Sequence, residues 1–396
     1  MSIWRYIVHS AVGLSRPGCH GESEMTSTAI PPATALPPGA AHIDHFAQAD
    51  AADLSGVQLR MIREAAPRFR EWFATTGTPD YVGTFDLVSL PYPTKFGLWR
   101  AALSPVPFLT ITNRLLVLRW KDAEGRTRTM LFEPSDVQLD GNTPYFKALR
   151  ESMPQQFERF TVTYHATVEE HLRRLGIRAE EVDYITFDHL HTQDVRRWIG
   201  TTTPQADISP AKPVEPYFPN ATMIVQRREL AALAELHPLQ RPWFQPEAYT
   251  DLRRDAIVEI EGDILLGPGI ALLSTPGHTP GNHSLVLNTT TGIWASSENA
   301  IAAECMAPEH SRIPGVRRWA GRWGQEVIIN ANTIENTAQQ YNSMVKEKSI
   351  VDRSRVDPRF PQFFPSSELT RNRLNPGTQP TFNHHAINHG SLTPQR

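Results

Sequence analysis

Hydrophobic and polar positions alternate through three segments in the first half of the chain. Residues 81–90, 108–120 and 126–134 carry alternating or β-branched apolar residues between turn residues, and each predicts a strand. Apolar positions three and four residues apart instead predict a helix over residues 57–74, interrupted by Pro67. A further helix is predicted within residues 141–153.

The second half of the chain repeats this succession of helices and strands. Residues 166–176 predict a helix that Thr167 caps and Gly176 closes. Helical spacing predicts two more helices, over residues 227–236 and within residues 325–350. Short apolar runs predict strands over residues 182–187, 221–226, 256–275, 283–289, 292–297 and 360–367.

Strand-rich blocks flanked by helices occur twice, which favours two packed sheets with helices outside them. We expect one domain over residues 46–396, with a loop-like tail from about residue 368. Residues 1–45 are rich in Pro, Ala, Ser, Thr and Gly, so we expect a disordered N-terminal arm. The aromatic, proline-rich segment 90–108 predicts either a flap over a substrate or a packed surface loop.

Composition limits the class of protein. The 396 residues are 40% hydrophobic and 20% charged, as in an ordinary globular protein with a sizeable core. The net charge of −3 predicts neither a nucleic-acid nor a membrane partner. Cys19 and Cys305 cannot build a disulfide framework, so we expect a reducing, cytoplasmic location. No apolar run approaches the roughly 20 residues that a spanning helix needs.

The stretch FDHLHTQD places two histidines directly after a predicted buried strand. His189 and His191 are two residues apart, so in an extended segment both imidazoles point the same way and reach one ion. Chemistry in α/β folds commonly lies at the carboxyl ends of strands. A solvated polar loop with two unconnected imidazoles explains the tripeptide equally well.

The stretch STPGHTPGNHSLVL supplies a third histidine. His278 lies in a turn that Pro and Gly residues bracket between two predicted strands, and Gly277 permits a close approach of the backbone to a ligand. Three protein ligands and one open position are the usual set of a catalytic zinc site. His283 lies five residues further on and is interpreted as packing beside the site rather than as a ligand.

These motifs resemble those of the metallo-β-lactamase superfamily. EEVDYITFDHLHTQD resembles the family's strand and H-x-H-x-D-H loop, and LLSTPGHTPGNHSLVL closely resembles its T-P-G-H-T-x-G motif. The resemblance covers about residues 80–370. It implies an α/β fold, a four-layer αβ/βα sandwich with the metal site at one edge of the two sheets.

The chain departs from the family pattern at the second metal site. Gln193 and Asp194 stand where the family has Asp and His, and Glu298 stands in place of the bridging aspartate. Ser366 and Ser367 stand where the last histidine is expected. The resemblance thus implies His189, His191 and His278 as metal ligands, with Glu298 as a fourth contact. Asp194 is expected to act as a ligand or base, and the other candidate ligands are His310, His384, His385 and His389.

The resemblance implies a metal-dependent hydrolase that uses metal-bound hydroxide on an ester, lactone or amide of a small molecule. We expect one zinc ion rather than two, with iron as the other candidate metal. A first alternative is a mononuclear non-haem iron oxygenase of the same fold. A second alternative is a non-catalytic ligand-binding member with an eroded site, which predicts that the metal is lost.

Overall fold

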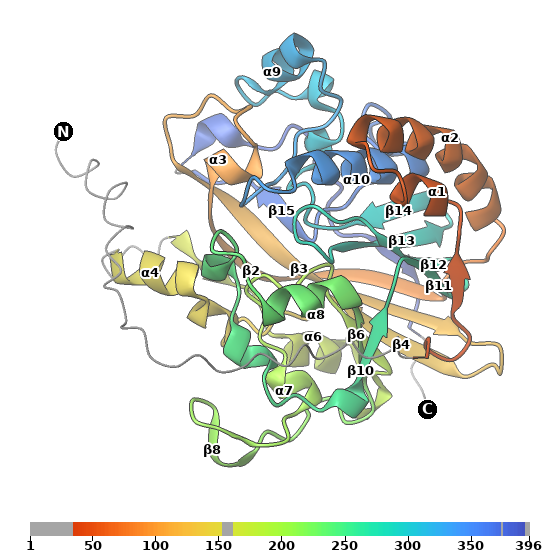
Figure 1. The fold of residues 1–396 in the computed structure, drawn as a ribbon, viewed down its shortest axis with the longest axis vertical. Helices are drawn as coiled ribbons and strands as arrows, with labels where there is room; N and C mark the ends of the chain where they lie inside the picture. Colours follow the sequence, from red (N-terminus) through yellow and green to blue (C-terminus); the bar gives the residue numbers. More distant parts are fainter. Residues whose placement is uncertain (1–34, 153–160, 374, 393–396) are drawn as a thin grey trace.

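Two β-sheets pack face to face with helices on their outer sides (Figure 1). The computed structural model describes residues 35–152, 161–373 and 375–392. The strands are β1 (Ala41–Ile43), β2 (Tyr81–Pro93), β3 (Phe108–Lys121), β4 (Thr127–Phe132), β5 (Thr163–Tyr164), β6 (Tyr184–Thr186), β7 (Pro204–Gln205), β8 (Ser209–Pro213), β9 (Thr222–Gln226), β10 (Ile257–Ile260), β11 (Asp263–Gly267), β12 (Ile270–Ser274), β13 (His283–Thr289), β14 (Gly292–Ser296), β15 (Ser367–Thr370) and β16 (Asn388–Gly390). The α-helices are α1 (Ala47–Asp50), α2 (Ser55–Phe73), α3 (Thr94–Gly97), α4 (Pro144–Ser152), α6 (Val168–Leu175), α7 (Arg196–Ile199), α8 (Arg227–Ala234), α9 (Val316–Trp323) and α10 (Thr337–Ile350).

The two sheets differ in strand direction. The larger sheet has the order β10-β9-β6-β4-β3-β2-β16, with β15 paired to β3 and β5 paired to β2. Its strands β4, β6, β9 and β10 are parallel, so their carboxyl ends meet at one edge. The smaller sheet, β1-β11-β12-β13-β14, is antiparallel throughout.

Successive side chains of β3 point to opposite faces of the larger sheet, and each face packs against a different layer. Leu115 and Val117 face outward and share a core with Leu172 of α6, whereas Leu116 and Leu118 face inward and share a core with the smaller sheet. Strand β12 alternates in the same way, and its outward side packs under α2 and α10. These cores confirm the predicted four-layer αβ/βα sandwich.

Three expected boundaries are wrong. Residues 41–43, assigned to a disordered arm, form β1 and pair with β11, while residues 1–34 of that arm lie outside the described residues. The segment 360–367 is not a regular strand, because two prolines within it cannot donate to a ladder, and β15 begins only at its last residue. The tail from 368, expected to be loop-like, contributes most of β15 and all of β16, which pairs with β2.

Helix α6 and strand β6 lead into the loop that carries His189 and His191. The Thr167 hydroxyl accepts from the Glu170 N–H at 3.3 Å and the Glu170 carboxylate accepts from the Thr167 N–H at 3.1 Å, which confirms the predicted cap. Gly176 ends the helix with φ 69°. Strand β6 then runs between β4 and β9. Among the described residues, no helix combines the length and apolar character needed to cross a bilayer.

Candidate metal centre

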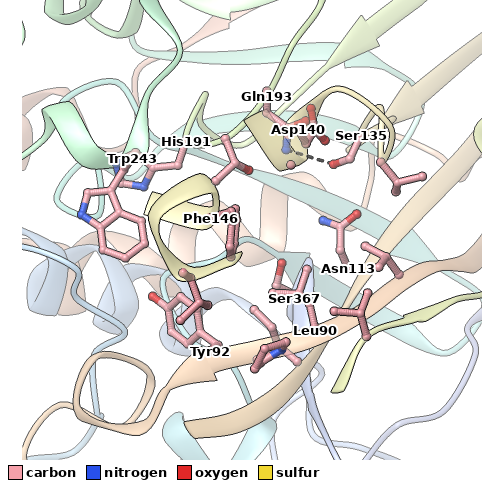
Figure 2. Close-up of a pocket in the computed structure, with 18 of the residues that line it drawn as sticks. Leu90, Tyr92, Asn113, Ser135, Asp140, Phe146, His191, Gln193, Trp243 and Ser367 are labelled. Atoms are coloured by element: carbon pink, nitrogen blue, oxygen red, sulfur yellow. Dashed lines mark hydrogen bonds between the residues drawn. The ribbon is translucent and has the colours of Figure 1, made fainter. Parts of the chain in front are cut away.

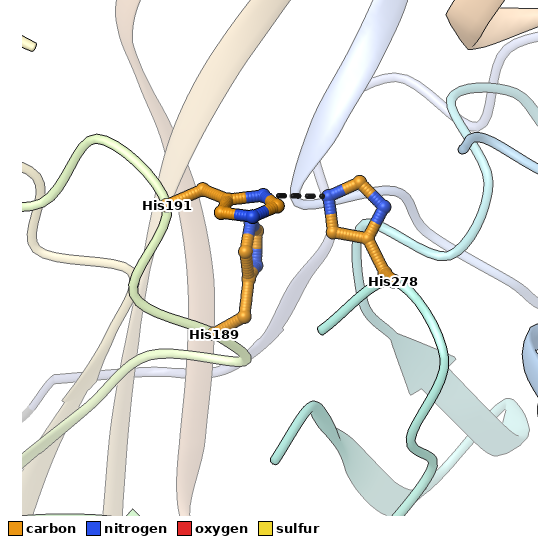
Figure 3. Close-up of side chains that lie close together, drawn as sticks. All are labelled: His189, His191 and His278. Atoms are coloured by element: carbon orange, nitrogen blue, oxygen red, sulfur yellow. Dashed lines mark hydrogen bonds between the residues drawn. The ribbon is translucent and has the colours of Figure 1, made fainter. Parts of the chain in front are cut away.

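Three buried histidines from two loops converge at one edge of the sandwich (Figure 3). His189 and His191 follow β6, and His278 lies in the turn between β12 and β13. One ligand atom of each lies within 4.8 Å of those of the other two. Their ring centroids are separated by 4.6, 4.8 and 5.0 Å. Within the described ranges, this is the only group of three or more His, Cys, Asp or Glu side chains spaced to hold an ion.

Hydrogen bonds on the outer side of two rings decide which nitrogen faces the centre. Nδ1 of His278 donates to the backbone carbonyl of Asn330 at 2.7 Å, since a carbonyl only accepts. Nε2 of His191 donates to Oε1 of Gln240 at 2.8 Å, while the amide nitrogen of the same glutamine donates elsewhere. Each proton therefore lies on the side of the ring that points away from the other histidines.

The inner nitrogens of His191 and His278 consequently carry lone pairs. Nδ1 of His191 and Nε2 of His278 lie 3.3 Å apart, and neither has a proton to donate to the other. The Asp188 carboxylate binds Nδ1 of His189, which leaves Nε2 of that ring for the centre. Three inward nitrogens, each oriented by an outer hydrogen-bond partner, fit the donor set of a histidine-bound divalent ion.

The electrostatics of the triad favour a single positive charge. Burial lowers the pKa of His278 to about 3, and burial and the charge of His189 lower the pKa of His191 well below its ordinary value. Burial opposes charge on His189 too, but the Asp188 carboxylate outweighs it and raises the pKa of that ring to about 9. A bound cation would replace this proton at the centre of the triad.

A buried carboxylate joins the two histidine loops. Glu229 of α8 accepts from the N–H of Leu190 at 2.9 Å, from the N–H of Gly281 at 2.9 Å and from the hydroxyl of Thr279 at 2.7 Å. Leu190 separates the two histidines of the first loop, and Thr279 follows the histidine of the second. One side chain therefore sets the distance between the loops.

The turn that carries His278 packs against α10. Gly277 has φ 136°, and a Cβ at this position would lie 2.2 Å from the backbone nitrogen of Gln340. The expected close approach at Gly277 is therefore made to α10 of the same chain. Only glycine fits there, so the position of the histidine depends on how α10 packs.

Asp194, expected as a ligand or base, is held by an arginine and is not among the ligand atoms of the triad. Its two carboxylate oxygens accept from Arg196 at distances between 2.6 and 3.3 Å, and both side chains are buried. The Arg196 guanidinium also forms an ion pair with the Asp207 carboxylate, at 2.7 Å. An aspartate whose oxygens are held by a guanidinium is not placed to act as the expected ligand or base.

The positions of the second metal site hold side chains that are engaged elsewhere. The Gln193 amide donates to the Ser135 hydroxyl at 2.9 Å, and the Ser366 hydroxyl donates to Asp188 at 2.8 Å. Glu298 lines the cavity beside the triad, but it is not in the group whose ligand atoms lie within 4.8 Å of one another. Burial raises the pKa of this glutamate to about 7.

The other histidines weighed as ligands lie outside the triad. Nε2 of His283 lies 3.1 Å from the Thr186 hydroxyl, and burial lowers the pKa of this histidine to about 4. His384 packs edge to face against Trp294. Among the described residues, no metal-binding group includes His310, His385 or His389.

A cavity of about 150 Å³ opens beside the triad (Figure 2). Its polar lining includes His189, His191 and Gln193. The apolar lining comes from Val88, Leu90, Ile111, Val137, Phe146, Leu149 and Val162. The segment expected as either a flap or a packed loop contributes Leu90–Tyr92 to this wall as the end of β2, while Leu98 and Ala101 are buried in the core.

Several residues that orient the site were not identified from the sequence. Asp188, Asn330 and Gln240 each bind the outer nitrogen of one histidine, and Glu229 joins the loops. Glu229 is the one acidic residue of α8 and is followed by five apolar residues, which is a weak sequence signal. Asp188 lies within the quoted FDHLHTQD stretch, whereas Gln240 and Asn330 belong to no motif.

Sequence comparison finds curated N-acyl homoserine lactonases of Bacillus. The chain is 32% identical over 118 residues to one from a Bacillus sp and 30% identical over 118 residues to one from Bacillus cereus. Each match covers 30% of this chain and 38% of the relative, so the chain spans well under half the length of these relatives. No family model matches the chain.

Solved structures with partial similarity include an N-acyl homoserine lactone hydrolase with the product N-hexanoyl-L-homoserine at its catalytic metal centre. That match has a TM-score of 0.40 and 20% identity and covers 63% of this chain and 90% of the other. A probable metal-dependent hydrolase from Staphylococcus aureus gives a TM-score of 0.46 and 10% identity, covering 67% and 83%. Similarity at this level assigns no activity. The two histidine motifs, the αβ/βα sandwich that joins them and the sequence similarity to lactonases together support a metallo-β-lactamase superfamily fold.

Proposed function

We propose that the protein is a metal-dependent hydrolase of a small-molecule lactone or related ester. The carrying observation is the set of three inward histidine nitrogens, each with an outer hydrogen-bond partner, beside a cavity with apolar walls. A carbonyl group would lie at the triad, and an apolar substituent would lie along β2, β3 and α4. The preference for a lactone over other esters or amides comes from the names of the curated relatives.

His189, His191 and His278 are the proposed ligands, and Glu298 is the carboxylate available to the same ion because it lines the adjoining cavity. A bound zinc ion would polarise the substrate carbonyl and lower the pKa of a water molecule to about 7. The protein's own part is to fix the three rings through their outer hydrogen bonds and to surround the substrate with apolar side chains. We keep one zinc ion rather than two in this proposal, since Gln193 and Ser366 are neutral and engaged elsewhere.

Two side-chain amides support a substrate that carries an N–H group near its apolar part. Asn113 and Gln193 both line the cavity, and each has a buried amide oxygen with no hydrogen-bond partner in the described part of the chain. A buried acceptor without a donor is costly, and an N–H of the substrate would satisfy it. An acyl-amide substituent combines such a donor with an apolar chain.

The test is elemental analysis of protein purified without chelator, together with hydrolysis of lactones that carry short and long acyl-amide chains. We expect about one zinc per chain and hydrolysis that improves with chain length. His191→Ala should lose both, while His42→Ala, which changes an exposed histidine in β1, should keep both.

Other outcomes separate the alternatives. Two tightly bound ions per chain would contradict the single-ion proposal. Iron together with oxygen consumption would favour the oxygenase, and absence of stoichiometric metal would favour the ligand-binding protein.

A further inference from the structure

Two segments far apart in the sequence form a basic and aromatic projection, which includes the uppermost helix in Figure 1. The α9 projection consists of residues 94–106 and 311–325. The N–H of Leu103 donates to the carbonyl of Pro314 at 2.7 Å, and a Cβ on Gly315 would lie 2.8 Å from Cγ of Leu103. The two segments are therefore in direct contact.

The charge of the α9 projection is opposite to that of the whole chain. Neither segment contains an Asp or Glu, although the chain as a whole carries a net charge of −3. The basic residues are Lys95, Arg100, Arg312, Arg317, Arg318 and Arg322. Whole-chain composition therefore conceals a local concentration of positive charge.

Helix α9 separates its arginines from its apolar side. Val316 and Ala320 are buried against the core, whereas Arg317, Arg318 and Arg322 are exposed. Trp323 lies on the same helical side as Val316, but it extends past the core and is 58% exposed. Leu103 is exposed to the same extent, 58%. The α9 projection therefore presents two exposed apolar side chains, Trp323 and Leu103, together with exposed arginines.

The arginines of this helix have few partners within the protein. Arg322 lies over the ring of Trp323, 5.4 Å from its centroid. Within residues 35–152, 161–373 and 375–392, no hydrogen bond or ion pair engages the side chains of Arg317 and Arg318. Glu326, the first acidic residue after the projection, pairs with Arg63. The positive charge is thus available to an external anion.

We propose that the α9 projection docks the protein on an anionic phospholipid surface. Trp and Leu side chains enter the headgroup region, and arginines reach phosphates with their charged ends while their stems stay on apolar surface. Basic side chains add attraction to anionic lipids. This proposal revises the expectation, made from net charge, that the protein has no membrane partner.

A single-stranded nucleic acid fits the projection less well. Such ligands need a basic groove with several exposed rings on which successive bases stack. Here Trp319 packs against the core and donates its N–H to Gln325 at 2.8 Å, so Trp323 is the one indole of α9 that is largely exposed. One exposed ring on a convex helix suits insertion into an interface.

The test is sedimentation of the full chain with vesicles of phosphatidylcholine alone or with about a third phosphatidylglycerol. We expect binding to the anionic vesicles only, weakened by added salt. Arg318→Glu with Arg322→Glu should reduce the partition coefficient about 25-fold or more, since each basic residue near such a surface contributes about fivefold. Trp323→Ala should weaken binding with the charge unchanged.

A matched double variant, Arg228→Glu with Arg254→Glu, makes the same charge change on α8 and on the turn before β10, at two other exposed arginines. It should bind like the native chain, and thermal unfolding of every variant checks the fold. Equal binding to neutral vesicles, no binding to anionic ones, or unchanged binding by the α9 double variant would overturn the proposal. Tight binding of a single-stranded RNA in place of vesicles would also overturn it. Vesicle binding is measured without hydrolysis, so its result neither supports nor contradicts the proposed function.

Discussion

Nδ1 of His191 and Nε2 of His278 lie 3.3 Å apart with no proton between them, because each ring carries its proton on the opposite side. Gln240 and the carbonyl of Asn330 hold those outer protons. The two facing lone pairs repel one another unless a cation lies between them. The outer partners therefore prepare the site, and removing one should be visible in metal affinity.

Gln240→Leu should weaken metal binding by about 10- to 100-fold, because it removes the acceptor that fixes the tautomer of His191. Competition with a chromogenic chelator measures the affinity. Gln325→Leu is the matched control, because it makes the same substitution at a glutamine that accepts from Trp319 instead of from a histidine. It should leave the metal affinity unchanged. Equal affinity in the two variants would show that the tautomer is not set by Gln240.

Glu229→Ala should lower the free energy of unfolding by about 3 kcal/mol or more, since it leaves three donors of the histidine loops without an acceptor. Glu229→Gln should cost less, because its amide oxygen still accepts some of these bonds. Chemical denaturation gives both values. A loss in the alanine variant no larger than in the glutamine variant would contradict the joining role of this carboxylate.

Asp194→Asn should act on stability rather than on catalysis. The carboxylate is buried against Arg196, and we expect a loss of about 2 to 3 kcal/mol, limited because Asp207 still pairs with the same arginine. The turnover of the folded, metal-loaded variant should stay within a few-fold of the native value. A large loss of turnover without a change in unfolding free energy would restore the base role expected from the sequence.

Glu347 should make the protein less stable as pH rises from about 4.5 to about 7. Burial raises the pKa of this glutamate to about 7, although Ser284, Ser297 and Asn299 donate to it and favour its charged form. The folded state thus holds the proton more tightly than the unfolded state, which has the ordinary pKa near 4.5. The contribution is complete below the unfolded pKa and is lost, by on the order of 3 kcal/mol, by the folded pKa.

Glu347→Gln should flatten this part of the stability–pH curve, because the amide resembles the protonated acid at every pH. Denaturation at intervals between pH 4 and pH 8 provides the comparison. Identical slopes for the native chain and the variant would assign the pH dependence to other groups.

The sequence by itself indicated two packed sheets with helices outside them, and its resemblance to a family implied the four-layer sandwich. The apolar runs of β3 and β12 are continuous, so both faces of these strands need covering, whereas α2 and α6 each have one apolar side. This pattern favours two packed sheets with helices outside them. Local chemistry also predicted the cap at Thr167, since its partner Glu170 is three residues away. Such features depend on neighbours along the chain.

Only the tertiary structure decided what surrounds the histidines and where charge gathers. Asp188 is next to His189 in sequence, but Gln240 and Asn330 reach the other two rings from about 50 residues away. The sequence predicted a catalytic Asp194 because it could not show that Arg196 occupies both oxygens. The α9 projection likewise arises only where residues 94–106 meet residues 311–325. Side-chain hydrogen bonds act over a few ångströms in space and charges act over about 10 Å, so chain separation carries little information about either.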